Sequence, residues 1–159
     1  SEADPALAAR LSGVAFSPCY ALMVAFDEPA GWPEVMRPQG AFDLVLRDSS
    51  KPGRDGTTEC WVAHAGADWS RANLEMDRAE ATTALLEALT DCAGPLPPLR
   101  YASAHRWRFA RPISPLGEAF AASADGTLLA GGDWALGRDV EDAVSSGRAM
   151  ARALLGQRV

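Results

Sequence analysis

Cysteine is scarce in this chain, and the few cysteines are far apart. Cys19, Cys60 and Cys92 are the three thiols, and their spacing contains no pair typical of a metal site. We therefore expect no bound metal. Three isolated thiols are typical of a reducing compartment, so we expect the protein to be cytoplasmic.

Long apolar runs and excess positive charge are also absent. No run approaches the length that a membrane helix needs, and residues 1–4 lack the basic start of a signal peptide. The net charge is -6, from 15 basic and 21 acidic residues, so we expect neither a membrane nor a nucleic acid as partner. Of the 159 residues, 48% are hydrophobic and 23% charged, which suits a globular domain with a real core.

The hydrophobic pattern predicts an α+β fold, with a mixed, largely antiparallel sheet and helices packed on it. Residues 19–27 are apolar at odd and even positions, which is typical of a central strand covered on both faces. Further strands are predicted at 41–47, 59–65 and 100–110, and a hairpin at 120–130. Helices are predicted at 5–11, 68–74 and 78–92, with Ala81, Leu85, Leu86, Ala88 and Leu89 toward the core.

The C-terminal end offers the clearest ligand chemistry. An apolar run stops at a glycine pair and Asp133, and an amphipathic helix follows with Asp139 as its N-cap and Gly156 as its stop. Glycines let backbone approach a ligand, Asp133 is an acceptor for sugar-like hydroxyls, and the helix start presents N–H groups. A flavin would use these features, but an ordinary strand–turn–helix has the same pattern.

Three other groups of residues suit ligand binding, and each has a structural alternative. Lys51 and Arg54 flank a Pro-Gly turn and would face an anion such as phosphate, or only solvent. His105 and Trp107 share one face of a strand, where they would bind a planar ring. The alternative is a core tryptophan with a satisfied histidine, and with the neighbouring arginines paired to surface acids. His64 lies opposite the core face of its strand and is expected to be a half-buried structural histidine.

The order of these pieces resembles the C-terminal half of renalase-like flavoproteins, within the flavin-containing amine oxidase superfamily. The resemblance covers residues 13–155. It rests on Ser-Pro-Cys-Tyr-Ala-Leu-Met-Val-Ala-Phe-Asp (17–27), Ser-Lys-Pro-Gly-Arg (50–54), Trp-Val-Ala-His (61–64), Trp-Ser (69–70), His-Arg-Trp-Arg-Phe-Ala (105–110) and Gly-Gly-Asp-Trp (131–134) with the helix at 140–147. The combination is more specific than any single motif.

The resemblance implies a two-part organisation and an FAD-dependent oxidoreductase in the intact protein. Residues 1–112 would belong to a substrate domain, and residues 113–159 would be the C-terminal hairpin and β-loop-α unit of the FAD-binding domain. The G-x-G-x-x-G fingerprint of the N-terminal half does not occur in this sequence. We therefore expect a fragment that is inactive alone and whose partner is the missing half of the same protein.

The resemblance also implies roles for individual residues, but it assigns no catalytic residue. The implied cofactor-binding residues are Gly131, Gly132, Asp133, Trp134, Asp139, Val140 and Ala143. The implied substrate-pocket residues are His105, Trp107, Lys51, Arg54 and His64. One departure is Asp142, since the superfamily pattern often has glycine there, and an acid would crowd a flavin edge or point to solvent.

The implied reaction is hydride removal from a small molecule to FAD, with O2 as the electron acceptor. The implied substrate is of the dihydronicotinamide type or an amine. The alternative is a cofactor-free binding or dimerisation module that kept the sheet. Because the missing half would normally cover part of the sheet, an exposed apolar face is expected, and it would favour a homo-oligomer.

Overall fold

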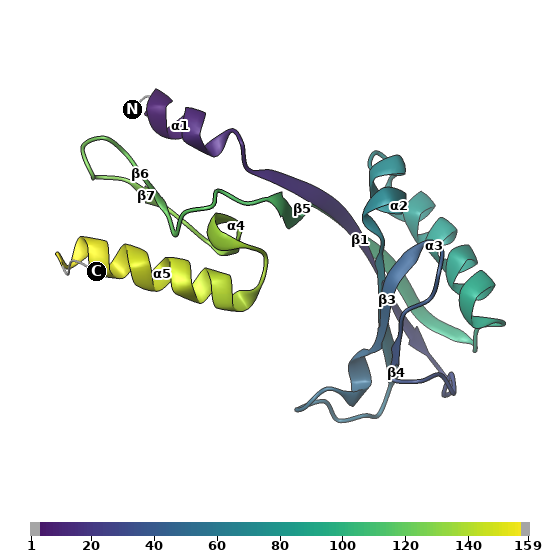
Figure 1. Cartoon of the computed structure of the whole chain (residues 1–159). Coiled ribbons are helices and arrows are strands. Elements are labelled where there is room, and N and C mark those ends of the chain that lie inside the picture. The colour runs from purple at the N-terminus through teal and green to yellow at the C-terminus, as the bar shows by residue number, and fades with distance from the viewer. Residues whose placement is uncertain (1–3, 157–159) are drawn as a thin grey trace. The chain divides into compact units, whose positions relative to one another are not determined.

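The computed structural model describes residues 4–156, which form two compact units (Figure 1). Unit 1 contains residues 4–17 and 109–156, and unit 2 is Pro18–Arg108. The helices are α1 (Pro5–Leu11), α2 (Ala67–Ala72), α3 (Arg78–Ala93), α4 (Asp133–Leu136) and α5 (Val140–Leu154), with a 3-10 helix at Asp48–Ser50. The strands are β1 (Ala15–Phe26), β2 (Val35–Met36), β3 (Phe42–Arg47), β4 (Glu59–Ala65), β5 (Leu99–Ser114), β6 (Ala121–Ala122) and β7 (Leu129–Ala130). The predicted α+β class is confirmed.

The division into units differs from the predicted boundary at residue 112 in two ways. The N-terminal residues 4–17 belong with the C-terminal segment, and the chain changes unit between Arg108 and Phe109, inside β5. The sequence predicts a strand over 100–110, but β5 continues through Pro112 to Ser114. An edge strand tolerates proline because its outer N–H groups need no partner strand, and β5 lies at the sheet edge.

The five-stranded sheet has the order β2-β3-β4-β1-β5. β4 pairs antiparallel with β1 on one side and with β3 on the other, so Ala63 lies opposite both Leu22 and Val45. The predicted antiparallel pairing of residues 41–47 with 59–65 is therefore confirmed. The two-residue β2 was not predicted, because so short a strand has no periodicity.

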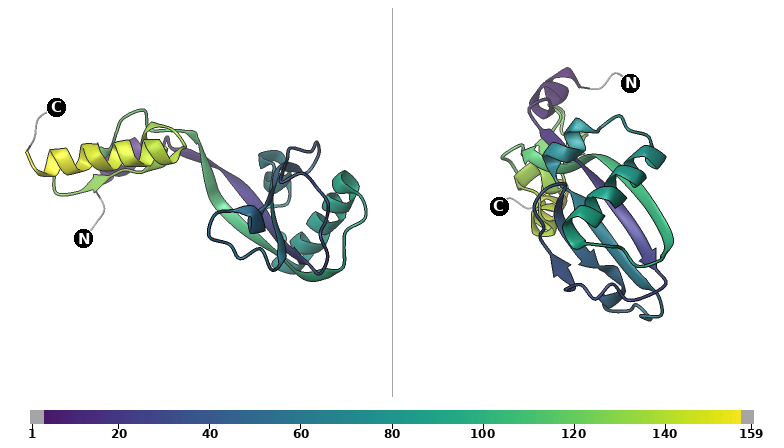
Figure 2. Two further views of the ribbon diagram at one scale, coloured as in Figure 1. Left: turned by 90° about the horizontal axis from the view of Figure 1, so that it is seen from below. Right: turned by 90° about the vertical axis from the view of Figure 1, so that its right-hand side faces the viewer.

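In unit 2, α2 and α3 lie on the same face of the sheet (Figures 1 and 2). Leu85 and Leu89 of α3 are fully buried against Leu22 and neighbouring core residues of β1. Burying such a side chain stabilises the fold by about 1.5–3 kcal/mol. The helix runs close to the predicted bounds 78–92 and ends before Gly94, and the Asp77–Glu80 capping box at its start was not predicted.

The opposite face of this sheet carries no α-helix from the described part of unit 2. We call it the open face. Because paired residues share a face, it includes Ala21 and His64, and because Ala104 of β5 packs in the core, His105 and Trp107 lie on the open face too. The prediction that β1 is buried on both sides is confirmed, although no α-helix of the described part of unit 2 covers its second side.

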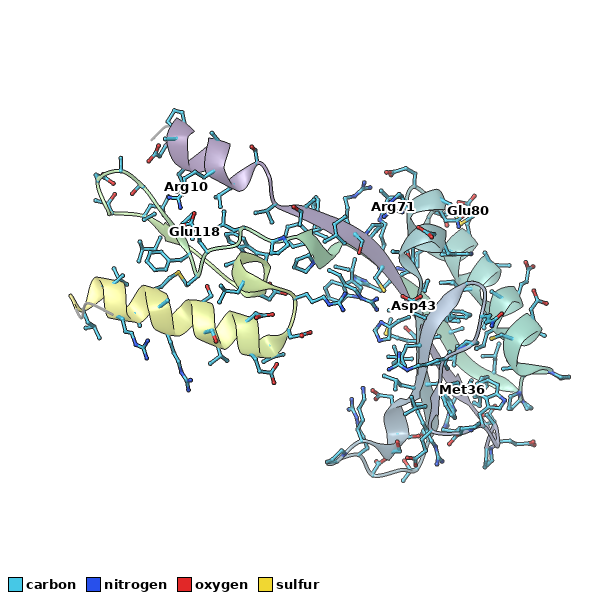
Figure 3. The ribbon with its side chains drawn as sticks, in the orientation of Figure 1. Arg10, Met36, Asp43, Arg71, Glu80 and Glu118 are labelled. Carbon is cyan, nitrogen blue, oxygen red and sulfur yellow. The ribbon has the colours of Figure 1, made fainter. Side chains whose placement is uncertain are left out.

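Unit 1 combines α1, the β6–β7 hairpin, α4 and α5. Asp4 caps α1 by accepting hydrogen bonds from Ala6 N–H (2.9 Å) and Leu7 N–H (3.2 Å). Arg10 and Glu118 approach one another and form an ion pair of 2.9 Å (Figure 3). The predicted loop before α5 contains the one-turn helix α4, which ends where Gly137 N–H bonds to Asp133 O. No helix among residues 4–156 is long and apolar enough to cross a membrane.

Asp125 organises the β6–β7 hairpin and should make it sensitive to acid. Hydrogen bonds from the Ser123 hydroxyl first, and then from Thr127, lower the pKa of Asp125 from 3.8 to about 2. Because the folded-state pKa is depressed, its stabilising contribution is complete above 3.8 and is lost as the pH falls toward 2. We expect an NMR titration of the Asp125 carboxyl carbon to have its midpoint near pH 2.

The matched variants separate this local effect from general acid denaturation. Asp125→Asn should remove the acid dependence of amide exchange in the hairpin. Asp68→Asn removes a fully exposed carboxylate on α2 and should leave it unchanged. An Asp125 midpoint at or above 3.8 would show that the Ser123 and Thr127 bonds do not persist in solution.

Candidate functional site

The glycine pair before α4 brings the end of β7 close to α5. A Cβ on Gly131 would overlap the Ser146 hydroxyl and lie 3.0 Å from Met150 Cε. The N–H of Gly132 donates a 3.0 Å hydrogen bond to Ser146 Oγ. Ser146 is completely buried, so this contact fixes α5 against the hairpin. The close approach that the glycines allow is therefore made by α5.

The Asp133 carboxylate is bound at the start of its own short helix. Its Oδ1 accepts a 2.8 Å hydrogen bond from the N–H of Trp134, because Asp133 is the first residue of α4. Among residues 4–156, Oδ2 of Asp133 has no donor, so only this oxygen remains for a ligand hydroxyl. Trp134 lines a separate hollow of about 240 Å³ with Leu11, Val14 and Phe16.

The start of α5 holds a carboxylate from its own first turn. Oδ2 of Asp142 accepts hydrogen bonds from Arg138 N–H (2.9 Å) and Asp139 N–H (3.0 Å). A Cβ on Gly137 would overlap this oxygen, so the glycine makes room for it. The position that a bound anion would take is thus partly filled by Asp142. Within residues 4–156, the N–H groups of Val140 and Glu141 have no acceptor.

A groove of about 460 Å³ opens beside this helix start. Its lining residues are Pro112, Ile113, Pro115, Gly137, Arg138, Asp139 and Asp142. Of the predicted cofactor-binding residues, only Asp139 lines it. Val140 is exposed and Ala143 half-buried on the following turn, while the residues from Gly131 to Trp134 face other parts of unit 1. The groove therefore joins an apolar wall to the polar start of α5, where the N–H groups of the lining residues are already bonded.

Lys51 and Arg54 converge on a single anion, as their spacing predicts, but that anion is Asp48. The Lys51 ammonium lies 2.6 Å from Asp48 Oδ1, and the Arg54 guanidinium lies 3.0 Å from Oδ2. The hydrogen bond from Lys51 is the main reason that the pKa of Asp48 is lowered. The two cations therefore share one carboxylate within the turn, and one positive charge remains.

His105 and Trp107 form an exposed ring pair on the open face. Their ring centroids are 4.5 Å apart with an interplanar angle of 64°. Trp107 is 56% exposed, so the alternative of a core tryptophan is wrong. Edge strands bury one face only, and the sequence alternation does not reveal which face that is. A planar ligand can reach both rings.

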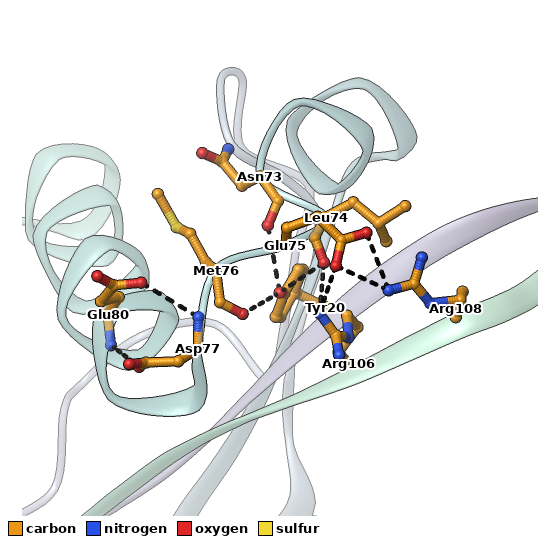
Figure 4. Close-up of polar contacts among 9 residues, drawn as sticks. All are labelled: Tyr20, Asn73, Leu74, Glu75, Met76, Asp77, Glu80, Arg106 and Arg108. Atoms are coloured by element: carbon orange, nitrogen blue, oxygen red, sulfur yellow. Dashed lines mark hydrogen bonds and ion pairs between the residues drawn. The ribbon is translucent and has the colours of Figure 1, made fainter.

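The arginines of the same motif hold the loop between α2 and α3 (Figure 4). Arg108 donates to both carboxylate oxygens of Glu75 at 3.0 Å, and Arg106 donates to Leu74 O at 2.5 Å. The Tyr20 hydroxyl reaches carbonyls of the same loop, at 3.0 Å from Met76 O. The alternative in which these arginines pair with surface acids is confirmed for Glu75. This fastening fixes β5, and with it the ring pair, to the helix layer.

His64 is half-buried on the open face, as predicted, and has a neighbour that the sequence did not reveal. Its Nδ1 lies 3.9 Å from the Sγ of Cys19. Cys19 is on β1 and His64 on β4, 45 residues apart, and only the strand register brings them together. His64 thus joins His105 and Trp107 on one face of the sheet.

Metal binding has no candidate in the described part of the chain, where no three His, Cys, Asp or Glu side chains are grouped to hold an ion. Two surfaces therefore remain as candidate sites. One is the groove at the start of α5 in unit 1, and the other is the open face in unit 2. No protein-family model matches this chain.

Proposed function

We propose that this chain is the C-terminal part of a renalase-like, FAD-dependent oxidoreductase. The observation that carries the proposal is the groove beside the start of α5, whose first two residues are Val140 and Glu141. N–H donors at the start of a helix of 15 residues favour a ligand edge rich in electrons. The ligand implied by the resemblance is a flavin, whose ring has such an electron-rich edge at N1 and C2=O.

The residues present fit one end of FAD. The two N–H groups suit the ring edge, and Oδ2 of Asp133 suits a ribityl hydroxyl. No residue set suits the pyrophosphate, because the glycine fingerprint does not occur in this sequence. FAD binding therefore requires the missing N-terminal half, and this chain alone is expected to be inactive.

When bound, FAD supplies hydride acceptance and electron transfer to O2. This chain would contribute the orientation of the bound groups and the electrostatic field around them. The N–H groups of Val140 and Glu141 would stabilise negative charge that develops at the ring edge. Trp107 and His105 would stack on a planar small-molecule substrate, for which a dihydronicotinamide or an amine is proposed. Lys51 and Arg54 contribute less, because both are already paired with Asp48. We expect the enzyme to work in the cytoplasm.

A second candidate function is a cofactor-free binding or dimerisation module. The specific observation in its favour is the exposed apolar side chains on the part of β5 in unit 2, Tyr101 and Trp107. Tyr101 is 55% and Trp107 56% exposed, and exposed apolar surface favours protein contacts. Size-exclusion chromatography of the 159-residue chain distinguishes the two, since the module should form dimers that added FAD does not change.

The test of the proposed function uses the full-length product of the reading frame that encodes this chain. It should purify with a flavin absorbance spectrum. Asp142→Ala should tighten FAD binding about fivefold, because it removes one nearby negative charge and frees two backbone N–H groups. A titration of the apoprotein followed by flavin fluorescence measures this change.

Glu141→Ala is the matched control for this experiment. It removes the same charge from the same helical turn, but it leaves Asp142 bound to Arg138 and Asp139. We expect a smaller gain in FAD affinity than for Asp142→Ala. A full-length product that neither contains nor binds flavin would reject the proposed function. Equal affinities for the two variants would show that Asp142 does not occupy the ring-edge position.

A further inference from the structure

The outer side of α5 carries a row of exposed apolar residues. We call it the α5 row, and its members are Val140, Val144, Gly147, Ala151 and Leu154. The intervals between them alternate between four and three residues, which keeps the row on one side of the helix. Val140 is 76% and Leu154 72% exposed. The side of α5 that packs in unit 1 is a different one, because Ser146 and Met150 lie against Gly131 (Figure 1).

Gly147 is the central residue of the 15 in α5, and no contact within the described chain requires a glycine there. A Cβ at this position would meet no atom within 4 Å, and the φ of Gly147 is not positive. Glycine in a helix interior is destabilising relative to alanine. What it offers is room for another backbone to come close. The middle of the α5 row is therefore shaped for a close approach from outside.

The charges beside the α5 row match a second α5 that runs in the opposite direction. Glu141 lies in the first turn and Arg152 in the last, and both are exposed. They are on the same flank of the row, because the eleven residues between their positions make about three turns. Neither side chain has a hydrogen bond or ion pair in the described part of unit 1.

An antiparallel pair centred on Gly147 brings these charges together. Glu141 lies six residues before the centre and Arg152 five residues after it, so each carboxylate would lie beside the guanidinium of the other copy. A parallel pair would instead place like charges side by side. The two Arg148 side chains would lie near the twofold axis, where they are long enough to turn toward solvent.

We propose that two copies of this chain pair through α5 in an antiparallel dimer with twofold symmetry. The α5 row would supply the apolar contact, and Glu141 and Arg152 would pair at both ends. The groove beside the start of α5 is lined by Asp139 and Asp142, which are not in the row, so the dimer leaves the groove open. A pair of 15-residue helices is small for a specific interface, so we expect a dissociation constant in the micromolar range. This inference does not rest on the proposed function.

The experiment is analytical ultracentrifugation of the 159-residue chain with reversed charges. Glu141→Arg and Arg152→Glu should each weaken the dimer about tenfold, because each turns two attractive pairs into two repulsive ones. An equimolar mixture of the two variants should regain the wild-type association, since opposite charges then meet at both ends. Both residues are exposed, so we expect both variants to fold, which circular dichroism checks.

Three further variants make the result specific. Leu154→Ser should also weaken the dimer, and Gly147→Ala should do so while it stabilises the separate folded chain. Glu87→Arg is the matched control, because it reverses an exposed charge on α3 and should leave the dissociation constant unchanged. A chain that stays monomeric at all concentrations would overturn the proposal. So would a mixture of Glu141→Arg and Arg152→Glu that associates no better than either variant alone. A dimer through β5, as in the second candidate function, would be weakened by Trp107→Ala instead.

The full-length product tests whether the missing half takes the place of the second copy. We expect a dimer with the same response to the two charge reversals, whether or not the product holds flavin. A monomeric full-length product beside a dimeric 159-residue chain would overturn the proposal, because the N-terminal half would then cover the α5 row. A dimer without flavin would reject the proposed function and support this one.

Discussion

Replacement of Trp61 by alanine should lower the free energy of unfolding of unit 2 by about 3–5 kcal/mol. Trp61 is 1% exposed, and its ring lies 5.1 Å from that of Trp32. Its indole N–H also donates a 2.9 Å hydrogen bond to Glu59, whose other carboxylate oxygen binds Arg47. The variant therefore creates a large cavity and removes a donor from a half-buried carboxylate.

Trp107→Ala is the matched control, because it removes the same side chain from the open face. Trp107 is mostly exposed, so its loss should change the free energy of unfolding by no more than about 0.5 kcal/mol. Urea denaturation followed by far-ultraviolet circular dichroism measures both values without relying on tryptophan fluorescence. Equal destabilisation by the two variants would contradict the burial of Trp61 and the exposure of Trp107.

Gly131→Ala should destabilise unit 1 by about 1–3 kcal/mol, which is the usual cost of overpacking. The new methyl group would collide with the buried Ser146 hydroxyl and press on Met150. The helix would have to move away from the hairpin, which would also weaken the bond from Gly132 N–H to Ser146. We expect faster amide exchange in α5, which hydrogen-exchange mass spectrometry detects peptide by peptide.

Gly147→Ala has the opposite expected sign and serves as the control. Gly147 lies in the interior of α5, and a Cβ there meets no atom within 4 Å. Alanine restricts the unfolded chain and favours the helix, so unit 1 should gain about 0.5–1 kcal/mol. If Gly131→Ala slows exchange in α5 as Gly147→Ala does, α5 does not pack against Gly131 as the structure shows.

Elements with a long periodic pattern could be predicted from the sequence. The spacing of Ala81, Leu85 and Leu89 identifies the buried face of α3. Likewise, β1 and β4 carry enough apolar residues to be recognised as strands, although their pairing with one another was not predicted. The physical reason is that burial of apolar area acts at every turn or every second residue, and this repetition is visible along the chain.

Interactions between segments far apart could not be predicted in this way. The contact of Cys19 with His64 depends on the register of two strands, and Asp142 is recognisable as a cap only when its carboxylate is seen to fold back. The ion pairs of Asp48 with Lys51 and Arg54 are local, but the sequence does not reveal with which anion the two cations pair. These contacts depend on side-chain direction and strand register, which composition does not reveal.

The Asp142 carboxylate acts as a counterion at the start of α5, so this helix start should bind chloride or phosphate weakly. Free anions of that kind collect at unoccupied helix starts in ordinary buffers, but here the Asp142 carboxylate would repel them. A neutral molecule with an accepting edge meets no such repulsion. The groove should therefore favour neutral ligands over anions. Chloride and phosphate in the cell should compete only weakly with such a ligand.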